Sequence, residues 1–162
     1  ALMDLVAGAR LEILTAIGTD DLAGLADRRR FRAHLSLGAG LDPTWLDLFS
    51  EAIRGITDSD EPRDFLDARR ELDLVGVGGP DNQGGAGWPT IERVDRDWIE
   101  TVARLDDSQL DRVAGRWIDL LGEELGDLPR EEKPWIRQLS GDLVAFCRSA
   151  HQAPDILFAW SL

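Results

Sequence analysis

The sequence contains no tyrosine and very little cysteine, histidine or lysine: one Cys, two His and one Lys occur in 162 residues. The single cysteine, Cys147, excludes a disulfide within the chain, and one free thiol is typical of a reducing cytosol. No apolar run approaches the length of about 20 residues that a membrane-spanning helix needs. The N-terminus carries Asp4 where a signal peptide has a basic region, so we expect a cytoplasmic protein that does not associate with membranes.

Basic side chains are also scarce relative to acidic ones. The chain has 18 basic and 31 acidic residues, which gives a formal net charge of −13, and the acids occur in both halves of the sequence. Such a surface repels phosphate backbones and anionic membranes and attracts basic proteins. The same charge also keeps a protein in solution without any specific partner. The composition therefore argues against nucleic acid as a ligand and favours a basic protein.

Hydrophobic residues make up 43% of the chain, which is enough for a packed core and excludes wholesale disorder. The length fits one domain, so we treat 1–162 as a single domain. Apolar residues recur at helical spacings between Gly, Pro and Asp residues. This pattern predicts an all-α bundle of five to seven helices, over about 2–17, 20–37, 43–53, 60–75, 95–105, 107–125 and from Pro129–Pro134 to 150. Periodicity leaves residues 156–162 open between a short C-terminal strand and a docked tail.

A glycine-rich segment, residues 76–89, divides the chain almost in half. Gly79 and Gly84 have the spacing of the glycines of a phosphate-binding P-loop, but the lysine and the hydroxyl residue that should follow are absent. We therefore expect no nucleotide cofactor here. The segment is interpreted as a connector between two helical halves, and the alternative is a mobile loop that closes over a ligand or is ordered by a partner.

Four tryptophans begin similar helical stretches, at Trp45, Trp98, Trp117 and Trp135, and each is followed by Leu or Ile and by an apolar residue four positions later. A helix that buries one apolar stripe presents such pairs. We predict that each helix inserts its tryptophan into a common core. The surplus of tryptophan is also compatible with a homodimer interface.

Cys147 and His151 lie four residues apart on a predicted helix, so their side chains share a face. They can ligate a metal or place an imidazole beside a thiol, but two ligands do not make a zinc site, and His34 is the only other histidine. Cys147 also lies on the apolar stripe of its helix, where a free cysteine commonly acts as a small buried hydrophobe. We expect no metal site and retain a small hydrolase or metal-dependent enzyme using His34, Cys147 and His151 as an alternative.

Arginines gather in the sequence RRRFRAH, residues 28–34, which contains Arg28, Arg29, Arg30 and Arg32. Arg29 and His34 have the Arg-x4-His spacing of one class of all-helical ribonucleases, but seventeen arginines produce such a match by chance and the acidic chain disfavours RNA. The arginines are interpreted as partners of neighbouring acids. The alternative is a small-anion site at this cluster.

Adjacent carboxylates occur at 20–21, 106–107, 123–124 and 131–132, and we interpret several of them as helix caps with no catalytic role. The sequence has no complete catalytic motif. The leading hypothesis is therefore a bacterial-type, immunity-like interaction or regulatory module of the cytosol that neutralises a basic partner such as a toxin.

Overall fold

The computed structural model describes residues 2–38, 41, 43–57, 64–67, 89–126 and 130–161. The chain forms two compact units, each assembled from separate segments. The first unit consists of Ala1–Leu41, Leu66–Val94 and Ser149–Leu162, and the second of Asp42–Phe65 and Asp95–Arg148. The glycine-rich segment lies outside the described residues apart from Pro89, so its interpretation as a connector stays a prediction.

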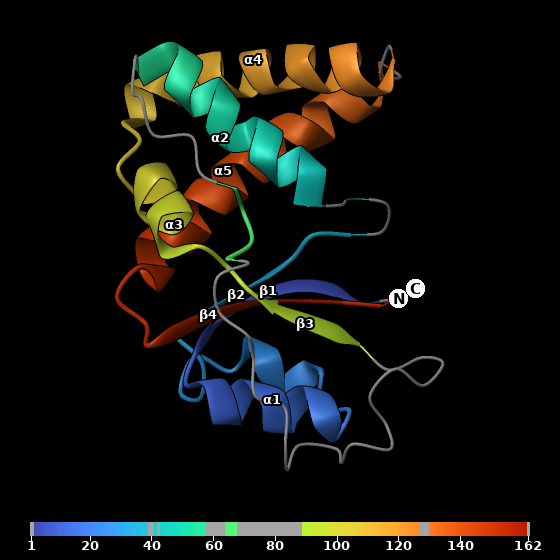
Figure 1. Cartoon of the computed structure of the whole chain (residues 1–162), viewed down its shortest axis with the longest axis vertical. Coiled ribbons are helices and arrows are strands. Elements are labelled where there is room, and N and C mark those ends of the chain that lie inside the picture. The colour runs from blue at the N-terminus through green and yellow to red at the C-terminus, as the bar shows by residue number, and fades with distance from the viewer. Residues whose placement is uncertain are drawn as a thin grey trace. The chain divides into compact units, whose positions relative to one another are not determined.

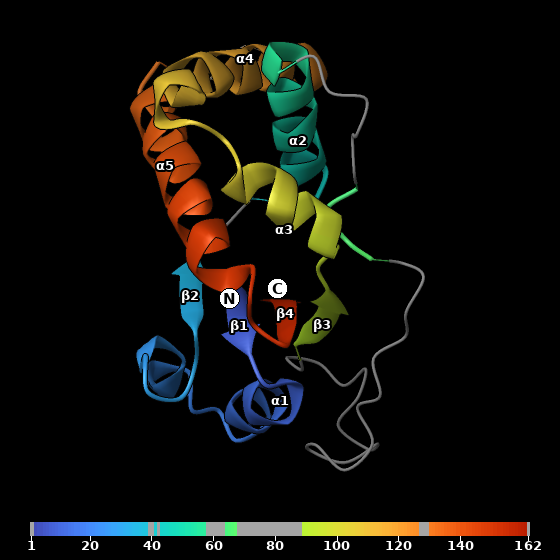
Figure 2. The same ribbon diagram turned by 90° about the vertical axis from the view of Figure 1, so that its left-hand side faces the viewer.

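The first unit is built on a four-stranded antiparallel sheet with the strand order β2-β1-β4-β3 (Figure 2). Its strands are β1 (Met3–Gly8), β2 (Ala33–Ser36), β3 (Thr90–Arg93) and β4 (Asp155–Trp160). Helix α1 (Arg10–Gly18) lies along one face (Figure 1). Together with the short 3-10 helix η1 (Ala23–Ala26), it buries a core that includes Val6, Ile13, Leu14, Ile17, Leu25 and Leu157.

The all-α helical bundle predicted from the sequence is therefore wrong, because the protein has an α+β fold. The two central strands are buried on both faces, so β1 and β4 read as nearly continuous apolar runs without the alternation that marks a half-buried strand. The apolar residues of β1 also continue into α1 at spacings that mimic a single helix over 2–17. At the C-terminus, the residues left open between strand and tail form β4.

The helix predicted over 20–37 is also wrong. Helix α1 ends in a Schellman motif, in which the Asp20 amide donates to the Ile17 carbonyl at 3.1 Å and the Asp21 amide donates to the Ala16 carbonyl at 2.8 Å. Asp20 adopts φ 59, the left-handed conformation that this motif requires. The Asp20–Asp21 pair thus closes a helix instead of opening one, and the chain continues through η1 and a turn into β2.

The second unit contains the helices α2 (Pro43–Thr57), α3 (Arg96–Ala103), α4 (Asp107–Leu125) and α5 (Glu132–Ala150), which confirms the helices predicted in these regions. Asp95 caps α3 by accepting from the Trp98 amide, and Asp106 caps α4 in a capping box with Gln109. Of the helix predicted over 60–75, only residues 64–67 are described, and Leu66 there bridges to Val94 within the first unit. Among the described residues, no helix has the length and hydropathy needed to cross a membrane.

The core of the second unit is aromatic. The Phe49 ring centroid lies 4.7 Å from that of Trp117, and the Phe65 centroid lies 4.9 Å from that of Trp98. The buried indoles of Trp98 and Trp117 donate to the carbonyls of Leu46 and Trp45, in the first turn of α2. The predicted insertion of tryptophans into the core is thus confirmed for Trp98 and Trp117. Trp135 departs from it, because 42% of this residue is exposed.

Candidate functional site

Cys147 is fully buried in the second unit, and this burial raises the pKa of its thiol well above the ordinary value. A thiolate is therefore disfavoured, and this environment does not suit a nucleophile. His151 follows α5 in the turn that leads to β4, and it belongs to the first unit. Within the part of the chain that the structure describes, no group of three or more His, Cys, Asp or Glu side chains is placed to hold a metal ion.

His34 is held by a carboxylate that the sequence did not single out as a site residue. It lies on edge strand β2 opposite Val6, and its Nε2 atom hydrogen-bonds to Oδ2 of Asp4 on β1. The side chains of His34 and Asp4 are only 16% and 11% exposed. Because the carboxylate fixes the imidazole, this pair resembles the acid–base half of a hydrolytic site. Among the described residues, however, no hydroxyl or thiol is hydrogen-bonded to His34.

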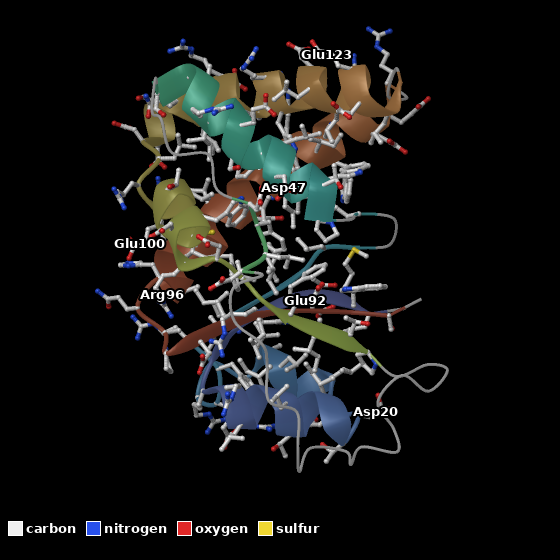
Figure 3. All side chains as sticks on the ribbon, in the orientation of Figure 1. Asp20, Asp47, Glu92, Arg96, Glu100 and Glu123 are labelled. Carbon is white, nitrogen blue, oxygen red and sulfur yellow. The ribbon has the colours of Figure 1, made fainter. Side chains whose placement is uncertain are left out.

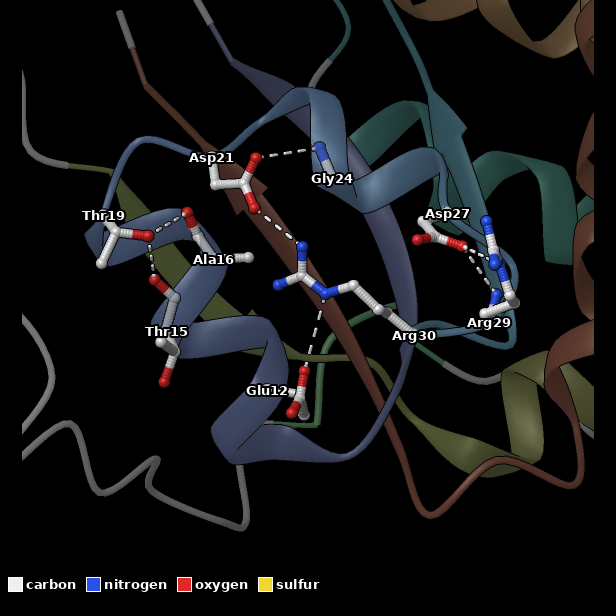
Figure 4. A network of polar contacts seen from close by, with 9 residues as sticks. All are labelled: Glu12, Thr15, Ala16, Thr19, Asp21, Gly24, Asp27, Arg29 and Arg30. Carbon is white, nitrogen blue, oxygen red and sulfur yellow. Dashed lines mark hydrogen bonds and ion pairs between the residues drawn. The ribbon is translucent and has the colours of Figure 1, made fainter.

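The arginine cluster divides among separate partners within the first unit. Arg30 binds Asp21 at 2.7 Å and approaches Glu12 at 3.8 Å (Figure 4), and its hydrogen bond lowers the pKa of the Asp21 carboxyl. Arg28 donates to the carbonyl of His34 at 3.3 Å, and Arg32 donates to the carbonyl of Ser149 at 3.1 Å. Arg29 is almost fully exposed beside Asp27. Arg29 and Arg30 thus lie beside acids as interpreted from the sequence, whereas Arg28 and Arg32 bond to backbone carbonyls. Because the arginines have separate partners, the structure does not favour a shared anion site.

Ion pairs neutralise the first half of α4. Asp107 pairs with Arg148 of α5 at 2.7 Å, and Asp111 pairs with Arg137 of α5 at 2.6 Å. These contacts link the first two turns of α4 to α5, and we refer to these two successive helices as the α4–α5 hairpin.

Where α4 ends and α5 begins, the described residues are mostly acidic, and their carboxylates form no ion pair with another described residue. Residues 119–132 include six acids and one base, Arg130. Five of the acids are described, all five are exposed, and none forms an ion pair with another described residue: Asp119, Glu123, Glu124, Glu131 and Glu132. Figure 3 shows Glu123 on the outer side of α4. We refer to these five residues as the acidic end.

Two carboxylates of the acidic end lie where helix electrostatics disfavour them. Glu123 and Glu124 occupy the last turn of α4, and this turn contains no basic residue. The carbonyl end of a helix carries partial negative charge, so an acid there costs about 0.3–1 kcal/mol. Leu125, in the same turn, is 53% exposed. Local arrangements that oppose stability are expected mainly at functional positions.

No protein-family model matches the chain, and neither a curated protein nor a solved structure shows detectable similarity to it.

Two candidates therefore stand on geometry alone: the acidic end and the Asp4–His34 pair. The acidic end was visible in the sequence as carboxylate pairs, but their lack of partners depends on the positions of Arg137 and Arg148. The sequence marks Asp4 in one way, because Asp4 is the only charged residue in the apolar run Leu2–Ala9.

Proposed function

We propose that the protein is a cytoplasmic interaction module that binds a basic protein through the acidic end of the α4–α5 hairpin. One observation supports this most directly: exposed carboxylates remain without ion-pair partners among the described residues, at a helix end that disfavours negative charge. A basic partner would neutralise them on binding. A protein that neutralises or regulates a basic toxin is the kind of function that fits, and the single cysteine is consistent with a reducing compartment.

The net charge of −13 supports the proposal at longer range. Opposite charges on two surfaces speed their encounter and make the association rate fall as salt screens them. We therefore expect affinity for a basic partner to fall between about 50 and 200 mM salt, since the screening length is about 10 Å at 0.1 M.

The test compares binding and stability in the same variant. Glu123→Gln with Glu124→Gln removes the two carboxylates at the end of α4, and binding to a peptide of repeated Ala-Ala-Lys units is measured by calorimetry at low salt. We expect affinity to fall about 2- to 30-fold, as for two exposed ion pairs of about 0.2–1 kcal/mol each. Stability should rise by about 0.5–2 kcal/mol, because the unfavourable dipole interaction is removed.

A matched control removes two charges elsewhere in the second unit. Glu51→Gln with Asp64→Asn gives the same net charge, and among the described residues neither acid has an ion pair. We expect this control to bind the peptide nearly as well as the wild type. Equal losses of affinity in both variants would mean that peptide binding depends only on the net charge, and this result would overturn the assignment to the acidic end.

Hydrolysis at His34 is a second candidate, because Asp4 fixes the imidazole in a mostly buried position. In such a site His34 would accept a proton from water as it attacks an ester. Its test is hydrolysis of p-nitrophenyl acetate by the wild type and by His34→Gln and Asp4→Asn variants, with folding checked by tryptophan fluorescence. Equal rates in the wild type and His34→Gln would eliminate this candidate.

A further inference from the structure

One face of α5 presents a polar stripe with a single aromatic residue. Glu131, Trp135, Gln138 and Asp142 follow one another at spacings of four, three and four, so they align along one side of the helix and the turn before it. The buried side of α5, which includes Leu139, Leu143, Phe146 and Cys147, borders this stripe, because Leu139 and Phe146 each lie four residues after a member of it. The stripe therefore runs along the edge of the buried side, where Trp135 is partly exposed and Asp142 is half-buried.

Trp135 is the anomaly in this stripe. Trp98 and Trp117 begin similar sequences and are completely buried, with their indole nitrogens bonded to carbonyls of α2. Trp135 is 42% exposed, and among the described residues its ring has no hydrogen-bond or aromatic partner. Tryptophan is enriched at protein interfaces, where its ring contributes a large contact area.

Carboxylates lie on both sides of Trp135. Glu131 precedes it by four residues and is exposed without an ion pair among the described residues. Asp142 follows by seven, and its Oδ1 accepts from the Gln138 amide at 3.2 Å, which leaves Oδ2 for another donor. The face thus combines an aromatic plane with acceptors at either end.

We propose that this stripe binds arginine side chains of the basic partner, with a guanidinium stacked on the Trp135 ring and hydrogen-bonded to Glu131 or Asp142. The inference rests on the proposed function and specifies how the partner is recognised. Among aromatic side chains, tryptophan forms the strongest cation–π contacts. The planar guanidinium of arginine can stack on the ring and donate hydrogen bonds to a carboxylate from its edge, whereas the lysine ammonium has no such plane. A second copy of the chain fits less well, because it would bring the same carboxylates together.

The test uses two peptides that differ only in the cation, one of repeated Ala-Ala-Arg units and one of repeated Ala-Ala-Lys units. Affinities of the wild type, Trp135→Leu, Trp135→Phe and Leu11→Ala are measured by fluorescence anisotropy of labelled peptides at low salt. Trp135→Leu keeps apolar bulk but lacks the ring, Trp135→Phe keeps a weaker ring, and Leu11→Ala removes an exposed apolar side chain of α1. Thermal unfolding of each variant confirms that it is folded.

We expect the wild type to prefer the arginine peptide about 2- to 5-fold, as for an exposed cation–π contact. Trp135→Leu should lose this preference while still binding both peptides, Trp135→Phe should keep part of it, and Leu11→Ala should keep it fully. Equal affinities in the wild type, or a preference that survives Trp135→Leu, would overturn this inference. If both peptides still bound less well to the Glu123→Gln, Glu124→Gln variant, the proposed function would stand. If neither peptide bound the wild type, both would fall.

Discussion

Asp155 at the start of β4 supports a large, specific prediction about stability. Its Oδ1 accepts from the Arg93 guanidinium at 2.6 Å, and its Oδ2 accepts from the Arg10 amide at 3.2 Å. That amide opens α1, whose N-cap residue, Ala9, provides no side-chain bond. One carboxylate therefore neutralises a cation and caps a helix within the first unit.

The magnitude follows from burial. The side chains of Arg93 and Asp155 are only 15% and 21% exposed, and Nε of Arg93 is buried without a hydrogen bond among the described residues. Removing one partner of a buried ion pair costs about 3–5 kcal/mol, because the other charge is left uncompensated. Losing a helix cap costs about 1 kcal/mol more. Since both side chains retain some contact with solvent, we expect Asp155→Ala to lower the free energy of unfolding by about 3 kcal/mol.

The assay is urea unfolding followed by tryptophan fluorescence, applied to Asp155→Ala, Asp155→Asn, Arg93→Met and the double variant Arg93→Met, Asp155→Ala. The Asn variant keeps an acceptor for Arg10 and should lose less than Ala. In the double variant no buried charge is left unpaired, so it should be more stable than Asp155→Ala alone. A loss below about 1 kcal/mol in Asp155→Ala, or strictly additive losses in the double variant, would refute this account.

Three further predictions concern single residues. Asp20→Gly should stabilise the protein by about 1 kcal/mol in thermal or urea unfolding, because glycine adopts the left-handed conformation at φ 59 without strain. A destabilised variant would contradict the Schellman geometry. Cys147 should resist modification by a thiol reagent at pH 8 until the protein unfolds, because burial raises its thiol pKa, and rapid labelling of the native protein would show that the thiol is accessible. Arg30→Ala should raise the pKa of Asp21 towards its ordinary value of 3.8 in an NMR titration, because the Arg30 hydrogen bond lowers this pKa. Since the folded pKa is lowered, the contact stabilises the protein above about pH 3.8, and this stabilisation is lost as the pH falls through the folded pKa. An unchanged Asp21 pKa in the variant would exclude the contact in solution.

The acidic end could be predicted only in part. Its carboxylates and the excess of acids over bases, six against one, are visible in the sequence from 119 to 132. That Asp107 and Asp111 are neutralised while Glu123 and Glu124 are not depends on which residues of α5 lie beside α4. Ion pairing between helices joins residues distant in sequence, so spacing along one helix does not predict it.

Local sequence by itself determined the helices of the second unit. Asp95 and Asp106 mark two helix starts because a carboxylate before a helix accepts a backbone amide, which is an interaction within a few residues. Amphipathic spacing then identifies α2, α4 and α5, since each helix buries one side. The excess of negative charge is likewise a property of composition and needs no fold.

Tertiary structure alone decided the sheet, the Asp4–His34 pair and the exposure of Trp135. The central strands are buried on both faces, so their sequences lack the alternation that would distinguish a strand from a helix. Asp4 and His34 are thirty residues apart and meet only because β1 and β2 pair in one register. Trp135 follows the same local pattern as Trp98 and Trp117, and only the packing of the second unit leaves it exposed. Strand pairing and burial are contacts between distant segments, and a local pattern cannot specify them.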